Sequence, residues 1–261
     1  MHGTEVYDDT NGFITREGDE FQAWYGYICE GIFQTQEEVD ASPLLYPGLT
    51  KPGDLKFKDV SGPEGKPDGI ISPEYDRVIL GSSQPHFTYG INLSFGWKGI
   101  ELSALFQGVG QQKVRRTRAM TTHTSSYYNF PKETLGKFWS YLNDNYHFGM
   151  YEWDDIYSTP EERAKAEFPR LDTKNYKNNY MVCTDKWLFD GSYFRCKNVT
   201  LSYSFQKNIL KKLRLDALKV FASASDLFCF SHFPQGWDPE MKNNGSSYIA
   251  KSFNFGVSVQ F

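Results

Sequence analysis

The feature that most constrains this chain is a strict alternation of apolar and polar side chains in its last segment, Ser252–Phe261, which reads S-F-N-F-G-V-S-V-Q-F. Successive side chains of a strand point to opposite faces of a sheet, so this segment has one apolar face and one polar face. Strands of soluble β-sandwiches and strands of membrane barrels both alternate in this way. The apolar face is formed by Phe253, Phe255, Val257, Val259 and the terminal Phe261.

The same alternation recurs in Phe87–Trp97 at a length that suits a membrane. Its odd-numbered positions are all aromatic or aliphatic, and its even-numbered positions are Thr, Gly, Asn, Ser and Gly. Its 11 residues are about what a tilted strand needs to cross a bilayer. Lys98 and Gly99 have the chemistry of a two-residue hairpin turn, and the returning strand, Ile100–Gln107, alternates except at Leu105.

Three further segments are rich in aromatic and β-branched residues and are predicted to be strands. They are Phe21–Phe33, Leu188–Phe205 and Leu215–Phe230, which brings the prediction to about six antiparallel strands. Six strands cannot close a barrel, because about eight is the minimum for known membrane barrels. The chain is therefore predicted to be a fragment of something larger.

The connections between these strands alternate in length. Gln34–Pro85, Gly108–Lys186 and Ser231–Tyr248 are long and polar, whereas 98–99 and Gln206–Arg214 are short turns. This asymmetry is typical of a transmembrane β-barrel, which has tight turns at the periplasmic rim and long loops outside. Two short surface helices are predicted within the second long segment, at Lys132–Asn143 and Pro160–Ala166.

Composition excludes several classes of protein. The net charge is −4, so the chain has no electrostatic footprint for nucleic acid. No run of about 18 apolar residues occurs, which excludes a transmembrane helix. The mean hydropathy of −0.56 is ordinary for a soluble protein, but a membrane barrel has the same bulk profile because its lumen and loops are polar. The first residues, Met1–Glu5, lack the pattern of a signal peptide.

A long ordered series of motifs resembles one family closely. From about Tyr25 to Phe261, the chain resembles the C-terminal part of SusC/RagA-type TonB-dependent outer-membrane transporters of Bacteroidetes. The motifs, in order, are YGYICEGIFQTQEEVD (Tyr25–Asp40), KPGDLKFKDV (Lys51–Val60), DRVILGSSQPHFTYGINLSF (Asp76–Phe95), ELSALFQGVG (Glu101–Gly110), FPRL (Phe168–Leu171), WLFDGSYFRCKNVTLSYSF (Trp187–Phe205), LKVFASASDLFCF (Leu218–Phe230) and the terminal strand.

This resemblance implies an all-β fold in which the chain supplies about six strands of a 22-stranded transmembrane barrel as an antiparallel meander with long extracellular loops. Residues 1–261 would form the C-terminal part of the barrel, with the plug domain and signal peptide absent. The implied function is import of large nutrients, oligosaccharides or peptides, across the outer membrane. The implied partners are outer-membrane lipid, a SusD-like surface lipoprotein, and TonB through the missing N-terminal part.

The resemblance also assigns a role to the terminal strand. In outer-membrane barrels, a final strand that ends in an aromatic residue resembles the signal read by the barrel-assembly machinery. An exposed strand edge can be recognised by β-augmentation, with alternate side chains supplying specificity. The alternative is that Phe261 is only an anchor at the membrane interface, like other aromatic girdle residues. The predicted signal residues are Phe253, Phe255, Val257, Val259 and Phe261.

One segment departs from the family pattern. The family commonly has a calcium-loop-like sequence after G-D-L-K-F-K-D, in which oxygen ligands at every second position suit a hard cation. Here Ser61 and the inserted residues 63–67 disrupt that spacing. The candidate ligands Asp59, Asp68 and Asp76 converge only if 63–67 loops out, and the alternative is a solvated turn without metal. No other cofactor is predicted.

No catalytic pattern is visible, so the chain is predicted not to be an enzyme. The histidines are scattered, and adjacent carboxylates such as Asp154 and Asp155 point in different directions. The alternative function is a soluble β-sandwich module that binds glycans. It would use loop aromatics for stacking, although these residues can equally pack the loops, and the substrate-binding residues are unknown. The aromatics are Tyr127, Tyr128, Trp153 and Trp237.

The arginine cluster and the cysteines carry no binding pattern. Arg115, Arg116 and Arg118 are interpreted as a solvated rim rather than an anion site. The cysteines form no C-x-x-C pair and have no histidine at ligand spacing, so neither a metal site nor a disulfide framework is predicted. They are Cys29, Cys183, Cys196 and Cys229.

Overall fold

The computed structural model describes residues 5–8, 12–116, 136–141, 158–171, 177–241 and 249–261. The chain forms two compact units, and each is described by itself. The sheet unit comprises Pro85–Lys113, Asp190–Met241 and Gly245–Phe261. The loop unit comprises Met1–Gln84, Val114–Phe189 and Lys242–Asn244.

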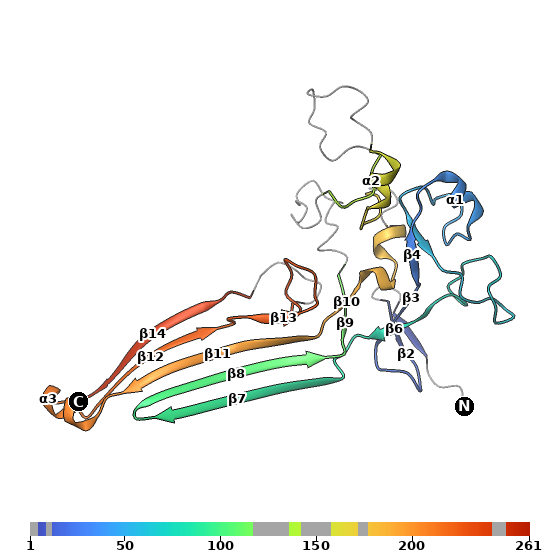
Figure 1. The fold of residues 1–261 in the computed structure, drawn as a ribbon. Coiled ribbons are helices and arrows are strands. Elements are labelled where there is room, and N and C mark those ends of the chain that lie inside the picture. Colours follow the sequence, from blue (N-terminus) through green and yellow to red (C-terminus); the bar gives the residue numbers. More distant parts are fainter. Residues whose placement is uncertain (1–4, 9–11, 117–135, 142–157, 172–176, 242–248) are drawn as a thin grey trace, which may run out of the picture. The chain divides into compact units, whose positions relative to one another are not determined.

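The sheet unit is an antiparallel meander of long strands (Figure 1). Their spatial order, β14-β12-β11-β8-β7, follows the order of the chain, and the short strand β13 (Cys229–Ser231) pairs with β11. This arrangement confirms the predicted antiparallel all-β fold. The long strands are β7 (Phe87–Trp97), β8 (Ile100–Gly110), β11 (Tyr193–Ser204), β12 (Ala217–Ser225) and β14 (Ser252–Gln260).

The register sorts the side chains of all five long strands onto two faces. One row across the sheet joins apolar residues through directly opposed pairs: Phe95, Leu102, Leu201, Ala222 and Phe255. Side chains that share a row point to the same side, so this row belongs to one continuous apolar face. That face is uncovered, since Phe95 is 65% exposed and Phe255 is 82% exposed.

The adjacent row shows the opposite face. It joins Ser94, Ser103, Thr200, Ser223 and Asn254, each directly opposed to the next. The alternation predicted within single strands is therefore kept in phase across the whole sheet. A large apolar face on one side and a polar face on the other is what a sheet needs when it separates lipid from water.

The predicted strand Phe21–Phe33 is wrong as a single long strand. It is divided into β3 (Ala23–Gly26) and β4 (Cys29–Ile32), which belong to different small sheets. The division has a steric cause, because a Cβ on Gly26 would lie 2.1 Å from the carbonyl oxygen of Cys183. The backbone there leaves its neighbouring strand, and the N–H of Tyr27 donates to that same carbonyl oxygen at 2.9 Å.

The other elements of the loop unit are short. Strand β3 lies in a four-stranded antiparallel sheet with the order β1-β2-β3-β6, β4 pairs with β5, and β9 pairs with β10. No helix among the described residues is long and apolar enough to cross a membrane. The bounds are β1 (Val6–Asp8), β2 (Phe13–Thr15), β5 (Leu55–Phe57), β6 (Val78–Ser82), β9 (Lys113–Arg115), β10 (Leu188–Asp190), α1 (Gln36–Ala41) and α2 (Pro160–Ala164).

The helix predictions have mixed outcomes. Helix α2 confirms the one predicted at Pro160–Ala166, and Thr159 caps it through a reciprocal capping box. Of the helix predicted at Lys132–Asn143, only residues 136–141 are described, and these are not helical. The turn predicted at Gln206–Arg214 is instead α3 (Lys207–Leu213), which ends at Arg214 in the left-handed conformation.

A buried polar network stabilises the loop unit. The carboxylate of Asp54, 2% exposed, accepts from Arg170 Nε at 2.6 Å and from Asn179 Nδ2 at 2.8 Å. The side-chain oxygen of Asn179 in turn accepts from the N–H of Leu55 at 2.9 Å, which ties β5 to a distant segment. The buried Asp54 carboxylate needs a cationic partner, because an uncompensated buried charge is strongly destabilising.

Replacing Asp54→Ala should lower the free energy of local opening of the loop unit by about 3–5 kcal/mol, because it leaves the Arg170 guanidinium without its buried partner. Native-state hydrogen exchange of the full-length protein, read at Leu55–Phe57, measures this change. The matched control is Glu167→Ala, which breaks the exposed ion pair between Lys137 and Glu167 and should cost about 1 kcal/mol or less. Equal losses of protection in the two variants would contradict the role assigned to Asp54.

Candidate functional site

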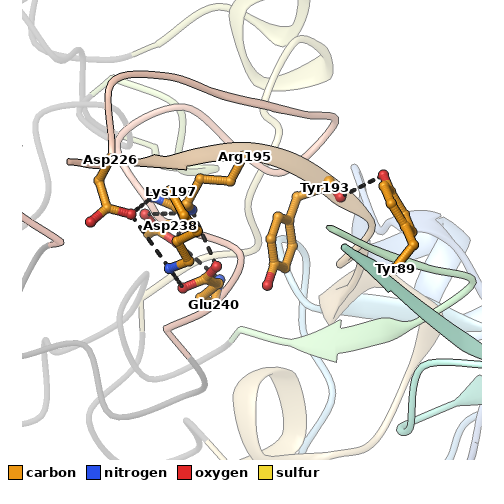
Figure 2. Close-up of polar contacts among 7 residues, drawn as sticks. All are labelled: Tyr89, Tyr193, Arg195, Lys197, Asp226, Asp238 and Glu240. Carbon is orange, nitrogen blue, oxygen red and sulfur yellow. Dashed lines mark hydrogen bonds and ion pairs between the residues drawn. The ribbon is translucent and has the colours of Figure 1, made fainter. Parts of the chain in front are cut away.

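A cluster of five charged side chains lies at the long-connection end of the sheet unit (Figure 2). Arg195 and Lys197 come from β11, Asp226 follows β12, and Asp238 and Glu240 lie beyond β13. The Arg195 guanidinium contacts both carboxylate oxygens of Asp238, at 2.5 and 2.6 Å. The Lys197 ammonium lies 2.9 Å from Glu240 and 3.4 Å from Asp226. We call this group the charged cluster.

The two cations of the charged cluster lie on the same side of β11, because residues two positions apart on a strand point to the same face. Both therefore reach the same carboxylates, Asp226 and Glu240. The register with β8 shifts between Cys196 and Asn198, so Lys197 is the extra residue of a β-bulge. Because a bulge changes the phase of the alternation, Asn198, opposite Leu105, also lies on the polar face of the sheet.

Burial makes the charged cluster more than a set of surface ion pairs. The Arg195 side chain is 3% exposed, and its carboxylate partners are 16–20% exposed. Charges that are partly buried are screened little by salt, so their attraction persists at physiological ionic strength. Together, two cations and three carboxylates attach residues 226–240 to β11.

Aromatic side chains are grouped on the apolar face at its long-connection end. Figure 2 shows Tyr89 reaching toward Tyr193, and the Tyr89 hydroxyl donates to the Tyr193 carbonyl oxygen at 3.2 Å. The Tyr89 ring is stacked on the Phe194 ring, and the Phe194 ring is stacked on the Phe106 ring. The interplanar angle is 11° in each pair. A Cβ on Gly108 would meet the Tyr89 ring at 2.3 Å, so glycine makes room for this stack. Aromatic residues with one polar tip are typical of a membrane–water interface.

The three predicted metal ligands do not form a shared site. Asp76 is fully buried, and its carboxylate accepts from the backbone N–H groups of Val60 at 2.7 Å, Ser61 at 3.1 Å and Ser72 at 2.7 Å. Asp59 accepts from Gly69 N–H at 2.6 Å, and Asp68 accepts from the N–H of Ile70 at 2.9 Å.

Across the described part of the chain, no group of three or more His, Cys, Asp or Glu side chains is placed to hold a metal ion. A calcium ion in this loop stays a prediction. Asp76 anchors the loop by satisfying backbone donors, a role that neither the metal nor the solvated-turn interpretation predicted.

The terminal strand is placed as an edge with an exposed apolar side. Among the described strands, β14 pairs with β12 alone, through nine residue pairs from Ala217–Gln260 to Ser225–Ser252. Phe261 lies just beyond it and is 89% exposed. The residues predicted as an assembly signal therefore share one accessible face, and their recognition stays a prediction. Their exposed fractions are 62% for Phe253, 82% for Phe255, 64% for Val257 and 43% for Val259.

The predicted arginine cluster and the loop aromatics proposed for glycan stacking lie only partly within the described residues. The solvated rim predicted for the arginines is wrong for Arg115 and Arg116, which are 8% and 1% exposed, and Arg118 lies outside the described residues. Burial lowers the pKa of Arg115, whose guanidinium donates to the carbonyl oxygens of residues 181 and 182 at 2.6 and 3.1 Å. Trp237 is half-buried next to Asp238, and the other three aromatics proposed for glycan stacking, at positions 127, 128 and 153, lie outside the described residues.

The cysteines of the loop unit are unreactive thiols. Burial raises the pKa of Cys29 to about 11 and that of Cys183 to about 11, which keeps both protonated near neutral pH. The thiolate is the form that acts as nucleophile and metal ligand. All four cysteines, which include Cys196 and Cys229 of the sheet unit, are unbridged.

The charged cluster was missed by sequence reasoning. Its members are spread over residues 195–240 of the chain, so no spacing rule joins them. The available signal was the pair of cations near the start of an otherwise neutral strand, in F-R-C-K-N, followed by an acidic D-P-E in the next long connection. Buried cations in a strand require carboxylates from somewhere, and that connection was the nearest source.

The known proteins that are similar to this chain in sequence are TonB-dependent receptors. No protein-family model matches the chain. TonB-dependent receptor P3 of Formosa agariphila is 26% identical over 94% of this chain and 21% of its own length. SusC, a TonB-dependent receptor of Bacteroides thetaiotaomicron, is 34% identical over 33% of this chain and 9% of its own length. The chain thus spans about a fifth of the length of P3.

The solved structures agree in fold. The RagAB peptide transporter matches 98% of this chain and 24% of the transporter chain, with a TM-score of 0.62 and 18% identity. RagAB in a closed-closed state matches 98% of this chain and 25% of its own chain, with a TM-score of 0.60 and 18% identity. Together with the relatives above, these matches confirm the resemblance inferred from the motifs.

Replacing Asp238→Asn should release the segment after β13, because it removes the charge that faces the buried Arg195 guanidinium. Hydrogen bonds to charged groups contribute about 1.5–3 kcal/mol, and this range is the expected loss of protection. Hydrogen exchange at residues 232–241 of the full-length protein measures it. The matched control is Glu101→Gln, at the exposed ion pair between Glu101 and Lys219, which should leave the protection of residues 232–241 unchanged. Unchanged protection in Asp238→Asn would refute the attachment role.

Proposed function

Because the chain is similar in sequence and in fold to one portion of a SusC/RagA-type TonB-dependent receptor, we propose that it forms part of the wall of an outer-membrane β-barrel importer. Similarity to transporters and receptors accounts for the absence of a catalytic pattern in the sequence. The observation that carries the proposal is the apolar face, which continues in register across all five long strands and has exposed side chains on β7, β8, β11 and β14.

Lipid is the environment that this face fits. A soluble protein rarely exposes a contiguous apolar patch of such extent. The soluble β-sandwich alternative requires a second sheet packed on the apolar face, about 10 Å away. Among the described residues, no such sheet covers it, since Phe95, Leu201 and Phe255 are all more than half exposed. The barrel wall therefore accounts for the exposure, whereas the glycan-binding sandwich does not.

The remaining strands of the barrel would come from outside this chain. The outer strands β7 and β14 each have one neighbour among the described strands. Unpaired backbone groups in hydrocarbon cost several kcal/mol each, so both edges require further strands of a barrel. We assign residues 1–261 to the C-terminal part of a 22-stranded barrel on the basis of the family resemblance. On that assignment, the short turns face the periplasm and the long connections face outside.

The substrate and the protein partners follow from the relatives. RagAB is a peptide transporter and SusC is a TonB-dependent receptor. By analogy, we assign the full-length protein to the import of large nutrients, peptides or oligosaccharides. The analogy also assigns a SusD-like surface lipoprotein and TonB as its partners, with TonB acting through the N-terminal part.

The terminal strand would serve the assembly of this barrel. Its free edge and its row of exposed apolar side chains fit recognition by β-augmentation, in which the backbone supplies affinity and alternate side chains supply specificity. Phe261 is the most exposed residue of the set, at 89%. We assign its ring, together with the four apolar residues behind it, as the feature that the barrel-assembly machinery reads.

Lipid exposure is tested with two neighbouring residues of β7. Leu93 lies on the apolar face opposite Ala104, and Ser94 lies on the polar face opposite Ser103. An arginine at the bilayer midplane costs about 2–4 kcal/mol on the lipid face of a barrel and little in the lumen. Leu93→Arg should therefore reduce the yield of folded full-length protein much more than Ser94→Arg, as measured by heat-modifiable gel mobility. Similar yields for both variants would contradict the assigned faces.

The terminal residue is tested by deletion. Removing Phe261 from the full-length protein should cause unassembled chain to accumulate in the periplasm and to be degraded, because the assembly signal is incomplete. Phe261→Tyr keeps an aromatic ring at the end and should assemble normally. Pulse-chase fractionation of the outer membrane and periplasm measures both. Normal surface assembly of the deletion, with only a modest loss of stability, would leave Phe261 the role of an interfacial anchor.

A further inference from the structure

A group of basic residues lies at the short-turn end of the sheet unit, and we call it the basic rim. Lys98 lies in the turn between β7 and β8, and the remaining members belong to α3 and its C-terminal cap. The acidic groups at this end are Glu101, which pairs with Lys219, the exposed Asp216 and the terminal carboxylate of Phe261. Cations therefore predominate at this end. The basic rim consists of Lys98, Lys207, Lys211, Lys212 and Arg214.

Hydrogen bonds between the connections show that these residues share one end of the sheet. The N–H of Ser204, just before α3, donates to the carbonyl oxygen of Gly99 at 2.8 Å. The N–H of Asp216, just after α3, donates to the carbonyl oxygen of Gln260 at 2.9 Å. The hairpin turn, α3 and the chain end are thus neighbours, and Figure 1 shows α3 and the C-terminus together at the end of the meander.

Helix α3 is amphipathic, and its apolar side is only partly buried. Leu210 packs inward at 8% exposed, whereas Ile209 and Leu213 are 41% and 53% exposed. Residues four positions apart lie on the same side of a helix, so Ile209 and Leu213 are adjacent, as are Lys207 and Lys211 on another side. A helix with exposed apolar residues beside lysines is typical of the membrane interface.

The basic rim borders the apolar face of the sheet. Trp97 and Val259, near the ends of β7 and β14, are 57% and 43% exposed on that face. The Lys98 ammonium lies 4.8 Å from the centre of the Trp97 ring, so one cation is held directly at this border. The chain also carries Arg214 in a left-handed conformation, φ 55°, where the backbone favours glycine.

We propose that the basic rim binds the headgroups of anionic phospholipids in the leaflet next to the short turns. The lysines of α3 would contact the headgroup phosphates, and Ile209 and Leu213 would enter the boundary with the acyl chains. The inference rests on the proposed function, because it requires the apolar face to lie in a bilayer. It adds a lipid class and a binding site to that function. Charge complementarity and continuity with the apolar face together identify the occupant.

The test uses the full-length protein purified from outer membranes, with Lys207→Gln, Lys211→Gln and Lys212→Gln combined. Native mass spectrometry measures retention of phosphatidylglycerol against phosphatidylcholine. A basic residue near an anionic surface strengthens binding by about fivefold, so three of them should change the preference for phosphatidylglycerol by about tenfold or more. The control combines Lys58→Gln, Lys66→Gln and Lys251→Gln, which are exposed lysines of the long connections and should leave the preference unchanged.

The outcomes separate the two proposals. Loss of the preference in the α3 variant, with recovery when arginines replace the same lysines, supports the basic rim as the binding site. An unchanged preference in a variant that still folds in the outer membrane, judged by heat-modifiable mobility, overturns this inference and leaves the barrel intact. An equal loss in the control variant also overturns it. Absence of the wild-type protein from the outer membrane overturns the proposed function and this inference with it.

Discussion

The constraint on which this structure depends is that each long strand must pair its backbone groups with neighbouring strands and also sort its side chains between an apolar and a polar face. A single slip of register would move every apolar side chain to the wrong face. The sheet meets this constraint with rows that stay in phase from β7 to β14, such as the row from Phe95 to Phe255. Along β11 the pairing with β8 shifts once, and the shift lies near the long-connection end.

The two ends of the same strands meet water with different chemistry. At the long-connection end, two cations on the same side of β11 meet carboxylates from the following connections, and the buried Arg195 holds them in place. At the short-turn end, α3 exposes its lysines and two apolar side chains. Ion pairs restrain a connection, whereas exposed cations remain available to an anionic surface. The asymmetry of connection lengths is thus matched by an asymmetry of charge.

Sequence reasoning succeeded where one local rule determines the structure. The alternation in Phe87–Trp97 predicted the bounds of β7, because both faces of the strand contribute to the pattern. It failed for Phe21–Phe33, which is aromatic without alternating, and whose path depends on the close approach of Gly26 to the backbone at Cys183. The helix in K-N-I-L-K-K-L was missed because the segment was interpreted as a turn, although Ile209 and Leu213 have helical spacing. The sequence offered the cations and the carboxylates of the charged cluster but not their pairing, since these partners meet only through the sheet.

Hydrogen bonds from backbone N–H groups to buried carboxylates explain how the loop unit can fold without long strands. Its irregular backbone must still pair its N–H groups, and buried carboxylates accept many of those bonds: Asp76 accepts three, and Asp54 accepts one from Lys51 in addition to its side-chain partners. Such anchors are specific to single positions, because each requires donors from a particular turn. Residues between the anchors carry no comparable requirement and can change without loss of the framework. Variation between the anchors is therefore compatible with the same framework, because connecting segments tolerate change more readily than the elements that they join.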